Sequence, residues 1–469
     1  MIRDKFLKIS QYIGDVIKDS KFDGHVYIVG GAVRSYLLDE DIKDIDICVD
    51  LPNGGIEFAE WIKNQGLTST VVSYPTYGTS MFKFHKYPNE EIECVMTRKE
   101  QYKDKNSRNP ETSFGTIYED SIRRDLTINA LYMKPDGEII DPTGKGLDDI
   151  KNKVLRVTND DPNVVFEDDP LRILRVIRFK TRYYDFTVDT LTFHSLMENV
   201  DRLSIITKER IRDEFQKILL SKHAVKGMEI LRYIGAMKYI IPELEQTYGL
   251  TQNAYHFGPV WDHTLALIEH YHEKYRPDLI CLLGCLLHDI GKIRTKSVGP
   301  DGRVHFYNHE NETQLVEDIL RRLKYDNYTI KEVCFLVKNH MRTKNFGDNC
   351  DKIKPKNLNK LIYTCKTKER YKRLIEVIEC DNLSHEPLHN IYGQYWYFMK
   401  HLDSPMFGYK LPIDGNEIMY VLGIEPGVEV KMIMDKLIKH AFSNPDINKE
   451  QCIKQLPHIL KLVRNELKK

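Results

Sequence analysis

The sequence lacks the features that mark zinc-ribbon and small secreted proteins. Its nine cysteines are scattered between Cys48 and Cys452, none of them stands in a CxxC pair, and the nearest two are Cys281 and Cys285. A zinc ribbon and a disulfide framework are therefore not expected.

Long apolar runs and an excess of charge are also missing. The longest apolar stretch near the middle of the chain, Leu279–Leu287, is far shorter than the ~20 residues that cross a bilayer. The N-terminus carries charges throughout and has no signal-peptide core, so we expect a cytoplasmic protein that does not enter membranes. Lys+Arg and Asp+Glu both number 69, so a polyanion would have to be bound by local basic clusters.

Length and hydrophobic spacing predict an α+β protein of several domains. At roughly 150 residues per domain, 469 residues suggest about three domains. Apolar residues at helical spacing over residues 6–17 predict a helix, and residues 25–29 predict a strand. Short β-rich runs alternate with turns up to about residue 155, which indicates a mixed sheet. After Pro170 the pattern is helical almost throughout.

Two stretches near the C-terminus are strongly basic. Residues 351–373 hold nine Lys or Arg against two Asp or Glu, and residues 431–469 hold nine against four. Such tracts can lie along phosphates. A solvated lysine-rich helix face explains them equally well.

The segments VGGAVRS and DIDICV predict a metal site that faces a phosphate site. Gly30 and Gly31 form a turn between a strand and a helix, where the backbone can approach a triphosphate. Asp44 and Asp46 follow on a strand, where alternation puts both on one face. Neighbouring carboxylates are costly without a cation, and their oxygens suit Mg²⁺. An exposed, non-functional pair is the alternative.

Glu93 is the candidate for a third carboxylate at this site. It lies in EEIECVMT, a predicted neighbouring strand, in phase with Glu91 and Val95. The alternative is a glutamate on an exposed strand face.

Five motifs in order resemble a known family. GGAVRS with DIDI, SRNPETSFGTIYEDSIRRDLTINALYM, DPTGKGLDDI, FEDDPLRILRVIRF and KERIRDEFQKIL are similar to the motifs of bacterial CCA-adding tRNA nucleotidyltransferases and poly(A) polymerases. The resemblance covers about residues 25–220. It implies that Asp44 and Asp46 bind two catalytic metal ions, with Mg²⁺ expected. With Glu93 they form the predicted catalytic set.

The resemblance also implies a nucleotide site. Arg124 and Asp125 fall where the family contacts the sugar and phosphates, and Asn129 supports that turn; a surface ion pair is the alternative for the first two. The predicted nucleotide-binding set is Gly30, Gly31, Arg34, Arg124, Asp125, Asn129, Asp169, Arg172 and Arg175.

The resemblance further implies that Asp169 and Arg172 select the base, because they match the family's base-reading element. A carboxylate that accepts and a guanidinium that donates match the donor-acceptor edge shared by cytosine and adenine, and mismatch uracil and guanine. The alternative is that Asp169 only caps the helix after Pro170. Two residues depart from the family pattern: Ser35 replaces an Asp, and Asp168 replaces a Glu.

A second set of residues resembles the HD superfamily of metal-dependent phosphohydrolases. The predicted ligands are His263, His288, Asp289, His309, His340 and Asp381, with the HD pair inside CLLHDIGK. Imidazole and carboxylate ligands suit Mn, Ni, Co or Fe as divalent ions. His309 and His340 are the weakest members, with ordinary structural histidines as the alternative.

Together these resemblances imply a polymerase β-like nucleotidyltransferase head, then an all-α neck and body, an HD domain and a helical tail. The expected bounds are 1–155, 156–250, 251–400 and 401–469.

The predicted function is template-independent addition of C, C and A to tRNA from CTP and ATP, with a phosphohydrolase activity attached. A poly(A) polymerase, a CC- or A-only enzyme, and an HD hydrolase with an RNA-binding head stay open as alternatives. The sequence does not indicate the oligomeric state.

Overall fold

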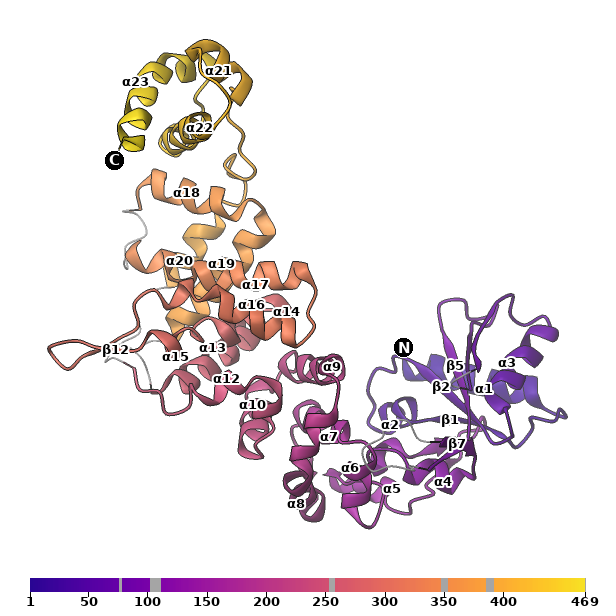
Figure 1. The fold of residues 1–469 in the computed structure, drawn as a ribbon. Coiled ribbons are helices and arrows are strands. Elements are labelled where there is room, and N and C mark those ends of the chain that lie inside the picture. The colour runs from indigo at the N-terminus through magenta and orange to yellow at the C-terminus, as the bar shows by residue number, and fades with distance from the viewer. Residues whose placement is uncertain (76–77, 102–110, 253–257, 347–352, 385–391, 469) are drawn as a thin grey trace. The chain divides into compact units, whose positions relative to one another are not determined.

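The computed structural model describes residues 1–75, 78–101, 111–252, 258–346, 353–384 and 392–468 (Figure 1). It divides into two compact units, Met1–Pro242 and Glu243–Lys469. Residues 107–110 of the second family motif, residues 351–352 of the first basic tract and Lys469 lie outside the described residues.

A seven-stranded mixed sheet forms the centre of the first unit, as predicted. The strand order is β3-β4-β5-β2-β1-β8-β9, and only β2 and β5 pair in parallel among these strands. The strands are β1 (Val26–Val29), β2 (Ile45–Val49), β3 (Val71–Tyr74), β4 (Thr79–Phe82), β5 (Ile92–Met96), β8 (Tyr132–Met133) and β9 (Ile139–Ile140). A separate hairpin pairs β6 (Arg98–Gln101) with β7 (Glu111–Phe114).

Alternation along the strands gives the sheet two different faces. Helices α1 (Arg3–Ile17) and α3 (Gly54–Asn64) cover one face and share its apolar core, which includes Ile45, Ile47 and Val49 of β2. The residues between these three, Asp46 and Cys48, therefore point to the opposite face. The helix predicted at residues 6–17 is confirmed as α1.

Helices complete the first unit. Those around the sheet are α2 (Gly31–Leu37), α4 (Ile117–Ile122) and α5 (Gly146–Asn152). The chain then continues through α6 (Pro162–Asp168), α7 (Leu171–Arg182), α8 (Thr190–Asn199), α9 (Lys208–Leu219), α10 (Ala224–Tyr233) and α11 (Met237–Ile240). Helix α7 packs against α9 and α10. Only the short pair β10 (Val154–Leu155) and β11 (Thr187–Val188) interrupts this helical part of the unit.

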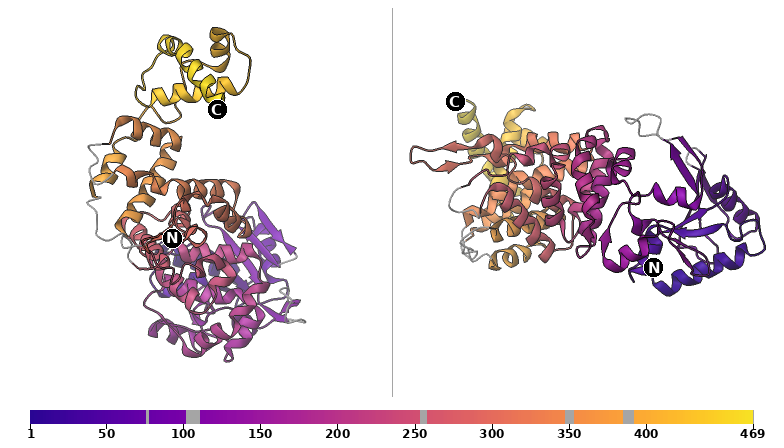
Figure 2. Two further views of the ribbon diagram at one scale, coloured as in Figure 1. Left: turned by 60° about the vertical axis from the view of Figure 1, so that its left-hand side comes forward. Right: turned by 90° about the horizontal axis from the view of Figure 1, so that it is seen from below.

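The second unit is built around one apolar helix. Helix α14 (Leu279–Leu287) is buried along nearly its whole length because its sequence, LICLLGCLL, has no polar face. It packs against α13 (Val260–Lys274), α17 (Asn327–Asn339) and α19 (Lys368–Leu383). Figure 2 gives two further views of these helices. The remaining elements of this part are α12 (Pro242–Glu245), α15 (Lys292–Thr295), α16 (Thr313–Arg322), α18 (Pro355–Cys365), α20 (Tyr392–Met399), β12 (Ser297–Val298) and β13 (Val304–His305).

The last helices have a core of their own. Helices α21 (Gly415–Leu422), α22 (Val428–Ala441) and α23 (Lys449–Leu467) pack on one another around Ile418, Ile433 and Leu456. The predicted helical character of the chain after Pro170 is thus confirmed.

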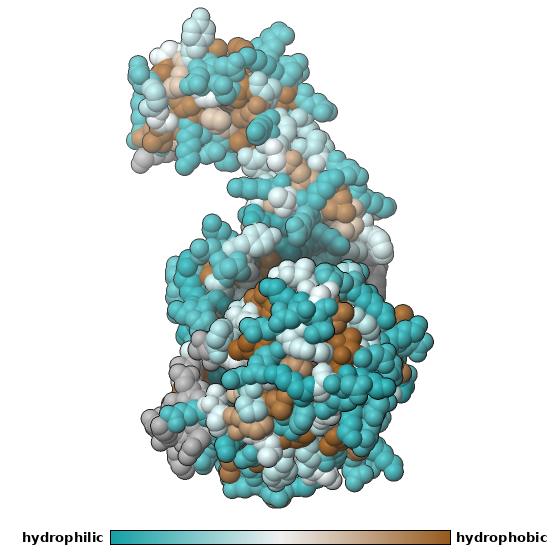
Figure 3. Space-filling model, turned by 90° about the vertical axis from the view of Figure 1, so that its right-hand side faces the viewer, coloured by the Kyte–Doolittle hydropathy of each residue, from teal (hydrophilic) through white to brown (hydrophobic). Residues whose placement is uncertain are grey.

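The surface, the helices and the cysteines have the properties that the composition predicts. Hydrophilic residues cover most of the face seen in Figure 3, with hydrophobic residues in small separate groups. Across the described residues, every helix is too short or too polar to span a bilayer. The eight cysteines in the described part of the chain are all free thiols, and seven of them are buried.

Candidate active site and metal centre

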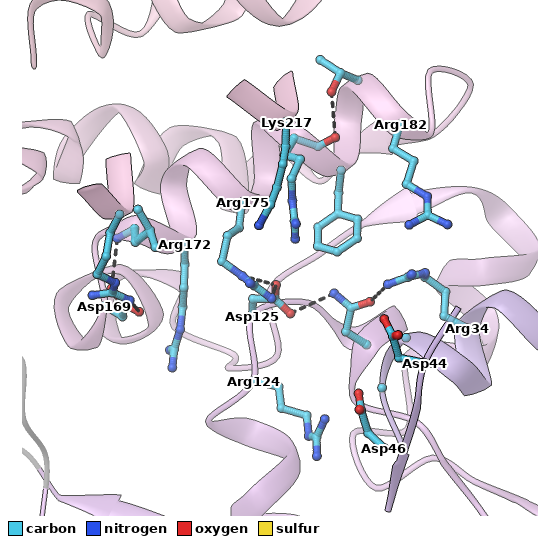
Figure 4. Close-up of a pocket in the computed structure, with 18 of the residues that line it drawn as sticks. Arg34, Asp44, Asp46, Arg124, Asp125, Asp169, Arg172, Arg175, Arg182 and Lys217 are labelled. Carbon is cyan, nitrogen blue, oxygen red and sulfur yellow. Dashed lines mark hydrogen bonds and ion pairs between the residues drawn. The ribbon is translucent and has the colours of Figure 1, made fainter. Parts of the chain in front are cut away.

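The carboxylates predicted to bind metal lie on the sheet face that α1 and α3 leave uncovered. Asp46 is on β2, and its neighbour in the parallel register is Glu93 on β5. Asp44 lies one residue before β2, not within it, yet it lines the same cavity as Asp46, and their side chains turn the same way (Figure 4).

The charges at this site favour a bound cation. Burial, together with the negative charges of Glu93 and Asp44, raises the pKa of Asp46 to about 6, although the positive charge of Arg124 opposes the rise. Like charges that raise a carboxyl pKa are relieved by a divalent ion, and oxygen donors suit Mg²⁺. The residues present therefore fit the expected metal. Glu93 lies outside the cavity lining and acts on it through Asp46.

The glycine turn adjoins these acids. Gly30 has φ +67°, a backbone conformation that favours glycine, and α2 begins directly after it. A Cβ on Gly30 would lie 3.3 Å from a guanidinium nitrogen of Arg124. The turn therefore lets the chain pass close to this arginine.

A chain of hydrogen bonds links three elements beside the acids. Arg34 of α2 donates to the Asn129 side-chain oxygen, Asn129 Nδ2 donates to Asp125 Oδ1 at 2.9 Å, and Arg175 Nε of α7 donates to Asp125 Oδ2 at 2.8 Å (Figure 4). Burial would raise the pKa of Asp125, but Arg175 and Asn129 hold it well below its usual range. The structure thus brings together four residues predicted for the nucleotide site.

Arg124 is held by a residue that the sequence analysis missed. Asp120 on α4 is fully buried, and its Oδ2 accepts from Arg124 NH2 at 2.9 Å and from the Tyr132 hydroxyl. Its Oδ1 accepts from Arg123 NH2 at 2.7 Å. Burial opposes ionisation, yet the two arginines lower the pKa of Asp120 to about 2. The sequence signal that could have identified Asp120 was its position four residues before Arg124 in a helical motif.

Asp169 and Arg172 both line the cavity, with partners of their own. Asp169 Oδ1 accepts from the Leu171 backbone N–H at 3.1 Å, which is the capping role considered as the alternative, and Oδ2 accepts from Arg210 at 2.8 Å. Arg172 donates to the backbone carbonyls of Val165 and Arg123. Their role in base selection stays a prediction, and Arg210 is a further residue that the sequence analysis missed.

The two departures from the family pattern have plain structural settings. Ser35 is buried within α2, and Asp168 is the half-buried last residue of α6, where burial raises its pKa. Both lie outside the cavity lining.

The cavity is large and basic. Its volume is about 2010 Å³, above the ~300–1,000 Å³ usual for a small-molecule pocket, so it has room for more than one nucleotide. Twelve Lys or Arg line it against five Asp or Glu. A site of this charge attracts polyanions.

The six predicted HD residues come together in the second unit. They come from α13, the ends of α14 and α17, the 3-10 helix His309–Asn311 and α19, and all six are buried. The members are His263, His288, Asp289, His309, His340 and Asp381. His263 Nε2 lies 3.2 Å from His288 Nε2 and 3.1 Å from Asp381 Oδ1, while His309 Nε2 lies 3.3 Å from His340 Nε2.

Each of these four imidazoles is oriented by a backbone carbonyl. The Nδ1 atoms of His263, His288, His309 and His340 lie 3.2, 2.8, 2.8 and 2.6 Å from carbonyl oxygens. A carbonyl only accepts, so Nδ1 carries the proton and the Nε2 lone pair faces the cluster. Burial and His288 lower the pKa of His340 to about 3, which keeps this ring neutral. Imidazole nitrogens beside carboxylates fit a divalent transition metal.

Lys292 is a further residue of this centre that the sequence analysis did not single out, although it ends the quoted motif CLLHDIGK. Its Nζ donates to Asp289 Oδ2 at 2.6 Å and to the Gln252 side chain at 2.6 Å, and the residue is 3% exposed. With His288, it holds the pKa of Asp289 well below the usual range against the effect of burial. Asp289 is therefore a carboxylate that can bind a metal.

Four cations of each basic tract pair with acids. In the first, Arg370 pairs with Glu332 and Arg373 NH2 lies 2.9 Å from Asp278. In the second, Lys436 Nζ lies 2.6 Å from Glu466. Their binding of RNA stays a prediction.

Three separate stretches of the chain match known protein families. Residues 26–156 match the poly A polymerase head domain, residues 185–247 match the probable RNA and SrmB-binding site of polymerase A, and residues 260–374 match the HD domain.

Two relatives and one solved structure carry related names. A multifunctional CCA protein of Acinetobacter baumannii is 31% identical over 368 residues, which is 76% of this chain and 83% of that protein. An A-adding tRNA nucleotidyltransferase of Deinococcus radiodurans is 36% identical over 234 residues, 48% of this chain and 52% of that protein. The Bacillus stearothermophilus CCA-adding enzyme in complex with CTP superposes with a TM-score of 0.71 at 19% identity, covering 98% of this chain and 99% of that chain.

The fold and these matches define the class, an enzyme with a polymerase β-like nucleotidyltransferase head and an HD domain. Within that class, the chain belongs to the family of the multifunctional CCA proteins, which confirms the resemblance found in the sequence.

Proposed function

We propose that the first unit adds C, C and A to the 3′ end of tRNA, using CTP and ATP. The observation that carries this proposal is the pair of carboxylates, Asp44 and Asp46, that lines a large basic cavity, with Glu93 beside Asp46 on the neighbouring strand. The family membership and the names of the relatives, one of which is said to act on tRNA, support it.

Asp44 and Asp46 would hold Mg²⁺, with Glu93 beside them. When bound, the metal supplies activation of the RNA 3′-hydroxyl and stabilises the departing pyrophosphate. The chain's own contribution is positioning. Asp120 holds Arg124, which would contact the phosphates, and Arg175 holds Asp125, which would contact the sugar.

Asp169 and Arg172 would select the base. Asp169 would accept from the exocyclic amine of cytosine or adenine, and Arg172 would donate to a ring acceptor. Uracil and guanine reverse the donor-acceptor order, which leaves buried groups unpaired at ~1–3 kcal/mol each.

The test is incubation of tRNA that ends at the discriminator base with CTP alone, ATP alone, and both. Addition of CC with CTP and of CCA with both is expected. Runs of A would instead identify a poly(A) polymerase, and addition of A only to tRNA ending in CC would identify an A-adding enzyme.

Asp44→Ala with Asp46→Ala should abolish incorporation, whereas Asp41→Ala, which removes a nearby exposed carboxylate, should retain it.

A second activity is proposed for the HD domain, hydrolysis of phosphate esters at RNA ends such as 2′,3′-cyclic phosphates. The six buried ligand residues favour this activity. One or more divalent ions of the Mn, Ni, Co or Fe type would supply the nucleophile at neutral pH. His288→Ala with Asp289→Ala should abolish hydrolysis and spare nucleotide addition; the reverse pattern would make the hydrolase the main activity.

We also propose the organisation that these roles require. The nucleotidyltransferase head is assigned to residues 1–155, the neck and RNA-binding body to 156–250, the HD domain to 251–400 and the tail to 401–469. A cytoplasmic location would give the enzyme access to tRNA, CTP and ATP.

A further inference from the structure

Two stacked rings lie at the wall of the nucleotide cavity, apart from the residues predicted to bind metal and nucleotide. The rings of Tyr184 and His223 have centroids 4.4 Å apart and planes inclined by 21°. His223 lines the cavity, whereas Tyr184 lies behind it, outside the lining, and is 55% exposed. Tyr184 therefore covers one face of the imidazole and leaves the other face toward the cavity.

The local structure holds the two rings together. Tyr184 lies two residues after α7, and His223 directly precedes α10. Ser221 Oγ donates to the Thr181 carbonyl oxygen at 2.9 Å, which ties the turn between α9 and α10 to the end of α7. Among the described residues of this turn, the His223 side chain makes no capping bond to α10, so the stack with Tyr184 orients the ring.

Cations surround this end of the cavity. Arg182, Lys217 and Lys222 line it together with His223. Arg182 and Lys217 also pair with acids, and Lys222 is exposed. An aromatic ring among cations is the arrangement with which proteins bind single-stranded nucleic acid, because the cations neutralise phosphates while a base stacks on the ring. This end of the cavity therefore has the chemistry of a site for a strand.

The location suits the strand that receives the nucleotide. In Figure 4, the predicted base-selecting pair, Asp169 and Arg172, lies on the opposite side of the cavity from Arg182. The bond between the two turns places His223 near the Arg182 side. A cavity of about 2010 Å³ exceeds the space that one nucleotide fills, so the last nucleotides of a bound strand fit at this side.

We propose that the ring of His223, backed by Tyr184, stacks on a base within the last three nucleotides of the RNA strand that is extended. Lys222 would contact a phosphate of the same strand. His223 is then an RNA-binding residue, and Tyr184 is a positioning residue that acts through it. The inference rests on the proposed nucleotide addition, because it assigns the strand that this reaction needs to one part of the cavity.

The test uses tRNA that carries 2-aminopurine at one of its last three positions, because stacking on an aromatic ring quenches the fluorescence of this base. Without CTP and ATP, saturating wild-type protein should quench one of the three probes. Saturating His223→Ala protein should not quench that probe. Equal quenching by both proteins, or no quenching at any of the three positions, would overturn the proposal.

Substitutions separate stacking from charge. His223→Ala should weaken tRNA binding about tenfold without changing the slope of log affinity against log salt, because a base–aromatic stack is lost and every phosphate contact is kept. His223→Phe should restore the affinity, since it keeps a ring, and Tyr184→Phe should restore what Tyr184→Ala loses. An equal loss in His223→Phe and His223→Ala would assign the effect to charge or hydrogen bonding and overturn the stack.

Tyr233→Ala is the matched control. Tyr233 is 69% exposed and stacks on Phe193 with ring centroids 6.1 Å apart, but it lies outside the cavity lining. It should bind tRNA as the wild type does. A loss equal to that of His223→Ala, in variants that keep their helical circular dichroism and cooperative unfolding, would contradict a site inside the cavity.

Nucleotide-addition assays keep the two proposals distinguishable. His223→Ala should raise the KM for tRNA and leave the KM for CTP unchanged, because the incoming nucleotide binds at the other side of the cavity. Addition of CCA by a protein that quenches none of the probes would support the proposed function and refute the stack. Quenching that depends on His223 in a protein that adds no nucleotide would support the RNA site and refute the proposed reaction.

Discussion

Asp120 is a buried anion whose removal would free two arginines at the edge of the nucleotide site. It accepts hydrogen bonds from Arg123, Arg124 and Tyr132, and it is fully buried. Its role is to position Arg124, since it lies outside the cavity lining.

Asp120→Asn should destabilise the protein by about 3 kcal/mol, because removing one partner of a buried ion pair leaves the other charges uncompensated. Chemical denaturation followed by circular dichroism measures this change. Asp160→Asn, which removes a carboxylate that is 90% exposed, should have little effect. Asp120→Asn should also raise the KM for CTP and ATP more than it lowers kcat. An unchanged KM would contradict the positioning role of Asp120.

The same carboxyl predicts a pH dependence. The pKa of Asp120 falls from 3.8 to about 2 on folding, so its contribution to stability is present above 3.8 and is lost as the pH falls toward 2. The unfolding free energy of the wild type should therefore fall more steeply over this interval than that of Asp120→Asn. Parallel curves would show that Asp120 does not titrate as inferred.

At the scale of elements, α7 links the head to the helices that follow it. It carries Arg172, Arg175 and Arg178 on the cavity side, and its buried apolar residues include Ile173, Val176 and Ile177. Arg175 connects this helix to the sheet domain through Asp125.

Arg175→Ala should lower kcat/KM for nucleotide addition by about 10- to 100-fold, because a charge-assisted hydrogen bond contributes ~1.5–3 kcal/mol. Arg175→Lys should restore part of the rate, since it keeps the charge. Lys180→Ala, on the same helix, is the control, because Lys180 bonds backbone carbonyls away from the cavity. Steady-state kinetics with each nucleotide checks the result, and an equal loss in Lys180→Ala would point to a folding defect.

Local sequence patterns predicted most of the helices and strands. The features that they missed depend on contacts between residues far apart in the chain. Periodicity was sufficient for α1 and β2 because apolar residues mark one buried face in each. The parallel pairing of Asp46 with Glu93 depends on a chain crossover, and the bond of Asp169 to Arg210 joins residues 41 positions apart. Motif spacing predicted the six HD residues that the structure brings together, but the contacts of Asp289 with both His288 and His309 depend on how helix ends meet in space.

At the scale of the whole molecule, charge is balanced overall and concentrated locally. The cavity of the first unit gathers twelve Lys or Arg in one place, whereas four cations of each basic tract are paired with acids. The cavity should therefore dominate binding to RNA phosphates.

Lys43→Ala and Lys222→Ala should each weaken tRNA binding for all tRNAs and reduce the slope of log affinity against log salt by about 1, because each removes one cation from the cavity. Lys436→Ala should leave the slope unchanged, since Lys436 pairs with Glu466. Filter binding at several salt concentrations measures the slopes. A larger effect from the tail variant would assign RNA binding to the basic tracts.

Because most of the thiols are buried, the rate of their alkylation reports how often the folded protein opens. Burial raises the pKa of Cys48, Cys94 and Cys285, so these groups are neither reachable nor ionised in the folded state. Cys334 is only half-buried, with its pKa raised to about 11. Iodoacetamide followed by peptide mapping should modify Cys334 before Cys48, Cys94 and Cys285, whose modification should be limited by the rate at which the folded core opens.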